Sequence, residues 1–119
     1  MSSAIEVRSS DGKFYWVRGD SDGNLYTKLT GSTLKDGNVA SVTTAGTRVQ
    51  LPSLVCSKVT IIAKRLNTGY IYVGKNTVSS TVYGAELAAL DSIDLEVSNL
   101  NEIWIDSSVS GEGICYVAI

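Results

Sequence analysis

Two acidic side chains, Asp94 and Glu96, stand two positions apart, a spacing that places both on one face of a strand. Paired carboxylates are the machinery of glycoside hydrolysis, in which one group protonates the leaving oxygen and the other attacks or activates water. The same pair on a wet face beside Asp91 also promotes solubility and protects a sheet edge. We therefore expect surface groups here rather than catalytic ones.

Two further motifs lie near the N-terminus. Residues 18–20 form an Arg-Gly-Asp tripeptide of the kind that integrins recognise, but they also fit a turn between two strands. Residues 20–24, Asp-Ser-Asp-Gly-Asn, place oxygen ligands at alternate positions as a calcium loop does, yet no glutamate stands at the twelfth position. We expect a solvated turn and no bound metal.

The chain of 119 residues contains no histidine, which removes the commonest general base and the Ser-His and Cys-His nucleophile pairs. No G-x-S-x-G or S-x-x-K motif frames a serine. Cys56 and Cys115 are far apart and have no metal or redox spacing, so two small buried thiols are expected, and a bridge between them stays open. These features predict no catalytic residues, no cofactor and no enzymatic activity.

Charge is nearly balanced, with 10 Lys and Arg against 12 Asp and Glu, for a net charge of −2. There is no basic excess to bind a phosphate backbone, so nucleic acid is not expected as a partner. Neither a signal peptide nor an apolar run of membrane-spanning length is present, so no membrane association is expected. Bases gather in residues 41–90 and acids in residues 91–119, which fits either cross-strand pairing or two patches that orient partner proteins.

Hydrophobicity alternates with period two through most of the chain, as in strands with one buried face. In residues 58–64, Val59, Ile61 and Ala63 share one face, and residues 92–97 repeat the pattern. The best candidate for a short helix is residues 84–90. Further strands are expected at residues 47–51, 70–74, 78–83, 102–106 and 113–119.

The segments between these strands contain Asn and Gly, which tolerate the positive φ of tight turns. Residues 67–69 and 98–101 therefore predict antiparallel hairpins. Seven or eight strands with one apolar face each are best closed as two packed sheets. We predict an all-β fold, a jelly-roll-like antiparallel β-sandwich.

The first 37 residues differ from the rest, because Asp-Gly pairs at 11–12, 22–23 and 36–37 cut them into short pieces. Residues 1–37 are predicted to form an extended N-terminal arm with a short β-ribbon, and residues 38–119 the β-sandwich domain. The strand-like stretches of the arm are residues 13–17 and 24–29. Since a lone ribbon is marginal in water, it is expected to lie on the sandwich or on another subunit, as in a homo-oligomer.

Five segments of the chain are recognisable together: residues 42–53 (VTTAGTRVQLPS), 58–64 (KVTIIAK), 67–74 (NTGYIYVG), 95–106 (LEVSNLNEIWID) and 111–119 (GEGICYVAI). These segments resemble a family of small virion structural proteins of tailed bacteriophages and prophages. The match extends over about residues 40 to 119, whereas the arm matches only loosely at Asp22 to Leu25. Leu90-Asp91-Ser92 departs from the Gly-Glu-Ser that such proteins usually have.

The resemblance implies a non-enzymatic protein of the virion, assembled in the host cytoplasm. We expect a head decoration or cement protein that binds and stabilises the assembled capsid, with the major capsid protein or other virion proteins as partners. A collar, neck or tail adaptor is one alternative, and a carbohydrate or receptor-binding module that uses Trp104, Tyr70 and Tyr72 for stacking is another. The expected protein-interface residues are Phe14, Tyr15, Trp16, Tyr26, Arg48, Lys64, Arg65 and Trp104.

Overall fold

The computed structural model describes residues 5–8, 14–17 and 32–119, and the chain divides into two compact units, Met1–Gly31 and Ser32–Ile119. In the first unit, β1 (Ile5–Arg8) pairs antiparallel with β2 (Phe14–Val17). The strand expected near residues 13–17 is therefore present, but its partner is a strand that the alternation did not indicate. The other predicted stretch, residues 24–29, lies outside the described residues.

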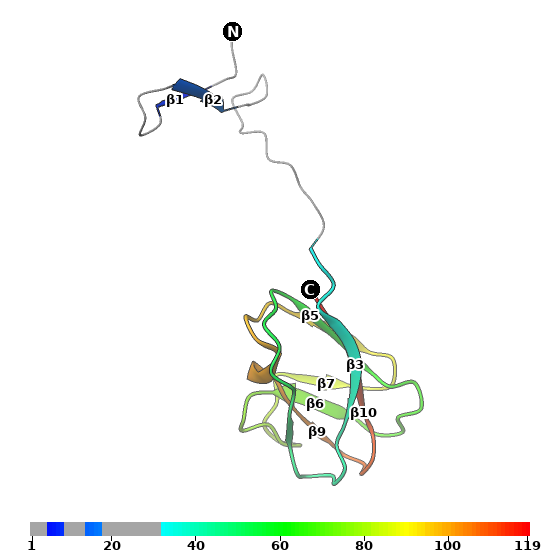
Figure 1. The fold of residues 1–119 in the computed structure, drawn as a ribbon. Coiled ribbons are helices and arrows are strands. Elements are labelled where there is room, and N and C mark those ends of the chain that lie inside the picture. The colour runs from blue at the N-terminus through cyan, green and yellow to red at the C-terminus, as the bar shows by residue number, and fades with distance from the viewer. Residues whose placement is uncertain (1–4, 9–13, 18–31) are drawn as a thin grey trace. The chain divides into compact units, whose positions relative to one another are not determined.

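Residues 32–119 form a jelly roll of two antiparallel sheets (Figure 1). One sheet has the strand order β3-β10-β5-β8 and the other β4-β9-β6-β7. Because the chain crosses between the sheets at almost every connection, strands distant in sequence become neighbours, and the predicted all-β sandwich is confirmed. The strands of this unit are β3 (Asp36–Ser41), β4 (Val49–Gln50), β5 (Val59–Ala63), β6 (Ile71–Gly74), β7 (Ala85–Leu87), β8 (Ser92–Leu95), β9 (Trp104–Ser107) and β10 (Gly113–Ala118).

The hydrophobic core lies between the two sheets. β5 buries Val59, Ile61 and Ala63 completely, as its alternation predicts. They pack in one cluster with side chains from the other sheet, among them Val73 of β6 and Ile105 of β9. Each fully buried Val or Ile stabilises the fold by about 1.5–3 kcal/mol. The core therefore holds both sheets face to face and makes their outer surfaces rigid.

The two predicted hairpins are wrong, because residues 67–69 and 98–101 carry the chain from one sheet to the other. β5 and β6 belong to different sheets, and so do β8 and β9. Before β9 a short 3-10 turn, η1 (Leu100–Glu102), has Asn99 as its N-cap, and the Glu102 carboxylate accepts the Asn99 N–H in a capping box. An asparagine that suggested a hairpin thus caps a helical turn at an inter-sheet connection.

The strand predicted at residues 78–83 is a loop. Val78 donates its N–H to the carbonyl of Lys75, and the Ser79 hydroxyl accepts the N–H of Val82. These local bonds compete with strand pairing for the same backbone groups. Val78 turns inward and is buried. Its apolar side chain is therefore explained by burial beneath this loop, and not by a strand.

Residues 84–90, the best candidate for a short helix, are not helical, because Ala85–Leu87 is strand β7. It pairs antiparallel with β6, with Leu87 opposite Ile71, and buries the Leu87 side chain in the core. Ala, Glu and Leu favour helices, but this preference is small beside the burial and pairing that β6 offers.

Strand β3 was not predicted, because Asp36–Ser41 contains only two apolar residues, Val39 and Ala40. It pairs with β10 along its whole length, and the Lys35 N–H also donates to the Ala118 carbonyl at 2.8 Å. The predicted end of the arm at residue 37 therefore falls inside β3. The body of the protein begins earlier than the composition indicated.

The connection between β5 and β6 is tied to the start of β10 by Glu112. Its carboxylate accepts the Thr68 N–H at 2.6 Å and the Gly69 N–H at 2.8 Å, and these bonds hold the pKa of Glu112 below its ordinary value of 4.5. The Asn99 N–H lowers the pKa of Glu102 in the same way. Both pKa values are lower in the folded chain than in the unfolded chain. The stabilisation that these two carboxylates give to the folded state is therefore present above pH 4.5. It is lost as the pH falls through their pKa values in the folded chain.

We expect the free energy of unfolding to decrease as the pH falls below 4.5, and Glu112→Gln to make that decrease shallower. Denaturant unfolding at a series of pH values measures both slopes. Glu96→Gln, at an exposed carboxylate of the acidic segment, is the matched control and should keep the full acid dependence. An unchanged slope in Glu112→Gln would contradict the role given to this carboxylate.

Candidate functional site

A row of polar and aromatic side chains crosses the outer face of the β4-β9-β6-β7 sheet. Glu86 lies opposite Tyr72, and Tyr72 lies opposite Asp106. Tyr72 is only 7% exposed, and the ring of Tyr83 packs against it with centroids 5.1 Å apart. Burial raises the pKa of Tyr72, and the carboxylates of Glu86 and Asp106 raise it further. Tyr72 therefore packs within the sheet face and does not offer an open ring for stacking.

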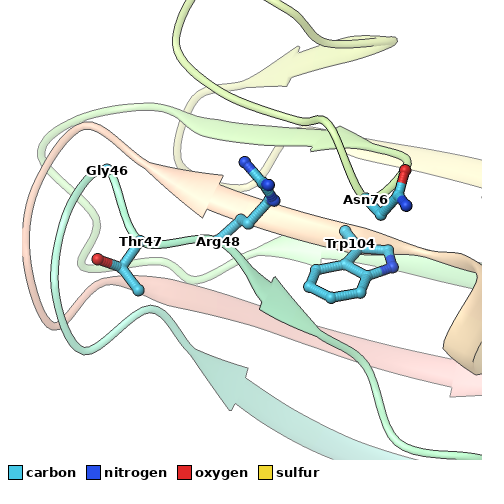
Figure 2. A pocket seen from close by; sticks show the side chains of 5 residues that line it. All are labelled: Gly46, Thr47, Arg48, Asn76 and Trp104. Carbon is cyan, nitrogen blue, oxygen red and sulfur yellow. The ribbon is translucent and has the colours of Figure 1, made fainter.

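A pocket of about 500 Å³ opens on the same outer face beside Trp104. Figure 2 shows that its side chains come from separate segments: Arg48 from the chain entering β4, Asn76 from the loop after β6, and Trp104 from β9. Gly46 and Thr47 complete the lining. The Trp104 side chain is half-buried, so part of its ring is anchored in the sheet and part faces the hollow.

The loop that forms one wall of the pocket is anchored by side chains of β9 and of the connection from β9 to β10. The carboxylate of Asp106, which is 1% exposed, accepts the Gly46 N–H at 3.0 Å. The hydroxyl of Ser110 accepts the Ala45 N–H at 2.9 Å. Gly46 has a φ of 86°, a left-handed conformation that glycine adopts without strain. These contacts fix the wall before any ligand arrives.

The lining is rich in hydrogen-bonding groups that have no protein partner within residues 32–119. The Arg48 guanidinium forms no ion pair there, and the only ion pair in that range joins Lys58 to Asp94. The Trp104 indole N–H and the Asn76 amide likewise make no hydrogen bond in that range. Several donors that face one hollow suit a ligand rich in acceptor oxygens.

Among the residues predicted at interfaces, the structure brings together Arg48 and Trp104. Lys64 and Arg65 lie in the connection that follows β5. Lys64 is half-buried and donates through Nζ to the Ser41 hydroxyl at 2.9 Å, whereas Arg65 is exposed. These two cations therefore belong to a different surface from the pocket.

The predicted interface residues of the arm stay predictions. Phe14, Tyr15 and Trp16 form three of the four positions of β2, for which the backbone pairing with β1 is described. Tyr26 and the two motifs at residues 18–24 lie outside the described residues.

A second surface lies on the outer face of the β3-β10-β5-β8 sheet. Val39 lies opposite Cys115, and Cys115 lies opposite Ile62, so one row of apolar side chains crosses three strands. Val117 follows on the same face of β10; Val39 is 60% exposed and Val117 43%. We name these four residues the outer apolar row. The outer face of a two-layer sheet is ordinarily polar, so these side chains make this part of the face unusually apolar.

Strand β3 is an edge of this sheet beside the outer apolar row. The N–H group of Gly37 donates to the side-chain oxygen of Asp36 at 2.9 Å, and the N–H group of Val39 donates to that of Asn38 at 2.8 Å. Those oxygens occupy donors that a further strand would need for pairing. Pairing of a further strand along this edge of β3 is therefore disfavoured.

The acidic residues mostly cap loops and do not pair with cations. Besides Glu102 and Glu112, Asp91 accepts the Ala88 N–H at 3.0 Å. In the described part of the chain, the Lys58–Asp94 contact of 3.9 Å is the only ion pair, and it joins β8 to the start of β5. Cross-strand pairing thus explains little of the charge separation along the chain.

The two cysteines are free, with Cys56 buried and Cys115 half-buried, so the bridge left open by the sequence is absent. No helix among the described residues is long and apolar enough to cross a membrane. Within the same ranges, no three side chains of metal-binding type gather in one place.

No protein-family model, curated protein or solved structure matches the chain. The function therefore has to be inferred from the two outer surfaces of the sandwich.

Proposed function

We propose that this protein is a non-enzymatic structural protein of a tailed-phage virion, and more specifically a head decoration or cement protein that binds the assembled capsid. The resemblance of residues 40–119 to small virion proteins supports this role, and so does a jelly-roll body, an architecture that viral capsid domains use. The outer apolar row is the observation that carries the proposal. It offers a rigid surface whose exposed apolar side chains a second protein can cover.

In this proposal the action of the protein is mechanical. The outer apolar row docks on a junction between capsid subunits, and Lys64, the residue after β5, donates to Ser41 at the end of β3. A protein that binds only the assembled lattice stabilises that lattice by mass action, without chemistry. The N-terminal segment provides a second attachment, to which the aromatic residues Phe14, Tyr15 and Trp16 contribute.

Replacing both Val39 and Val117 by lysine is expected to weaken binding to phage heads at least tenfold. The two substitutions put charges into a contact that has to be dry, and a loss of about 1.4 kcal/mol already corresponds to a factor of ten. Cosedimentation of the purified protein with assembled particles, followed over a range of concentrations, measures the change.

Val82→Lys is the matched control, because Val82 is 53% exposed but lies in the loop between β6 and β7 on the other sheet. It should bind particles like the unmodified protein. Equal binding by the Val39→Lys, Val117→Lys double variant would remove the outer apolar row from the proposal. Labelled protein over the whole head supports decoration, whereas a single ring at the neck would favour the collar or tail adaptor.

A further inference from the structure

We propose that the pocket beside Trp104 is a binding site for an acidic saccharide, a pyranose that carries a carboxylate, such as a uronic or sialic acid residue. The site is independent of capsid binding, because the pocket lies on the outer face of β4-β9-β6-β7 and the outer apolar row lies on the other sheet. A volume of about 500 Å³ is within the range of small-ligand sites, about 300–1,000 Å³.

Arg48 is the group that selects a carboxylate. Its guanidinium is exposed, lines the pocket and has no ionic partner within residues 32–119. The carboxylate of Asp106, which anchors the loop, accepts the N–H groups of Gly46 and Ser107 through Oδ1 and forms no ion pair with Arg48. An arginine presents two parallel N–H donors that match the two oxygens of a carboxylate. The free guanidinium therefore favours an anionic ligand over a neutral one.

Trp104 is the group that selects a sugar ring among carboxylates. The face of an indole carries negative charge density, which attracts the C–H groups on one face of a pyranose. Figure 2 shows the indole ring, the Arg48 side chain and Asn76 around one hollow. A carboxylate held by Arg48 thus leaves the attached ring beside the indole.

Asn76 and Thr47 match the hydroxyl groups of such a ring. An amide and a hydroxyl each donate and accept hydrogen bonds, and each sugar hydroxyl requires both. Both residues are exposed on the pocket lining and come from opposite walls, one before β4 and one after β6. The N–H of Gly46 is anchored by Asp106, which reduces the ordering cost of binding.

The test is a titration of the full-length ¹⁵N-labelled protein with glucuronic acid and with N-acetylneuraminic acid, followed by NMR. Glucose and sodium acetate are the matched probes for the ring alone and for the carboxylate alone. We expect at least one acidic sugar to shift the Trp104 indole N–H and to bind at least tenfold more tightly than glucose or acetate. Arg48→Gln should weaken that binding at least tenfold, and Arg65→Gln, which changes an exposed arginine outside the pocket, should leave it unchanged.

Three results would overturn the proposal. The first is the absence of a Trp104 shift with both acidic sugars. The second is acetate, or an acidic peptide, that binds as tightly as the sugars, since the pocket would then recognise a carboxylate without its ring. The third is full affinity in Arg48→Gln. Because Arg48 is exposed, Arg48→Gln tests the site without disturbing the core. Trp104→Phe, which keeps an aromatic ring, should retain part of the affinity.

Discussion

Gly113→Ala is expected to lower the free energy of unfolding by about 3 kcal/mol, a large effect for one methyl group. Gly113 begins β10 and lies opposite Ser41 of β3. A Cβ atom at this position would collide with the backbone carbonyl of Ala40 and lie 2.7 Å from the Ser41 Cα. Since backbone atoms cannot swing aside as a side chain does, the β3–β10 pairing has to open. Equilibrium unfolding in urea measures the loss.

Gly111→Ala, two residues earlier, is the control for this argument. Gly111 has a φ of 86°, but no atom lies within 4 Å of a Cβ built there. The cost at Gly111 is therefore conformational, about 1–2 kcal/mol, and Gly111→Asn should recover part of it because asparagine tolerates this φ. If Gly113→Ala were no more destabilising than Gly111→Ala, the close approach of β3 to β10 would not govern the stability of this corner.

The layers of the fold could be predicted because they follow from side-chain alternation. Val59, Ile61 and Ala63 are buried where period two placed them, and the opposite face of β5 is wetter. Connections could not be predicted in this way. Asn99 has a side chain that suits both a tight hairpin and a helix cap, and local sequence does not distinguish between them. The choice is made by the sheet to which the next strand belongs.

Residues 84–90, the best candidate for a short helix, contain strand β7 instead, for a related reason. Helix preference summed over one or two turns is worth little, because a short helix has to be nucleated without support. β6 offers three pairing positions to Ala85–Leu87 and a core site to Leu87. That partner is not visible in the local sequence, so the tertiary contact overrides the local preference.

The candidate site could be predicted only in part. Arg48 and Trp104 were expected at interfaces, but nothing in their spacing indicates that they share a pocket. They meet because β4 pairs with β9, with Gln50 opposite Trp104. Asn76 carries no signal at all, since only the course of the loop after β6 brings it to the pocket. Asp106 does carry a signal in the sequence, because a carboxylate that follows the apolar Ile105 in a strand has to lie on the outer face. Its burial on that face does not follow from the alternation.

Asp106→Ala is expected to lower the free energy of unfolding by about 2 kcal/mol. The Asp106 Oδ1 atom accepts the N–H groups of Gly46 at 3.0 Å and of Ser107 at 2.8 Å, in a place where the residue is 1% exposed. Alanine leaves the buried Ser107 N–H and the part-buried Gly46 N–H without this acceptor, and an unpaired buried donor costs about 1–3 kcal/mol. Asp106→Asn keeps one acceptor oxygen and should cost less. Urea unfolding of the two variants measures this difference.

The same substitution should release the wall of the pocket, because Asp106 holds Gly46 across 60 positions of sequence. Hydrogen exchange of the Gly46 amide is expected to become faster in Asp106→Ala and to remain slower in Asp106→Asn. Asp94→Ala, at an exposed carboxylate on the other sheet, provides the control and should leave Gly46 exchange unchanged. An Asp106→Ala variant with unaltered stability and unaltered Gly46 exchange would mean that another group anchors the loop. The pocket would then owe its shape to the Ser110 contact with Ala45.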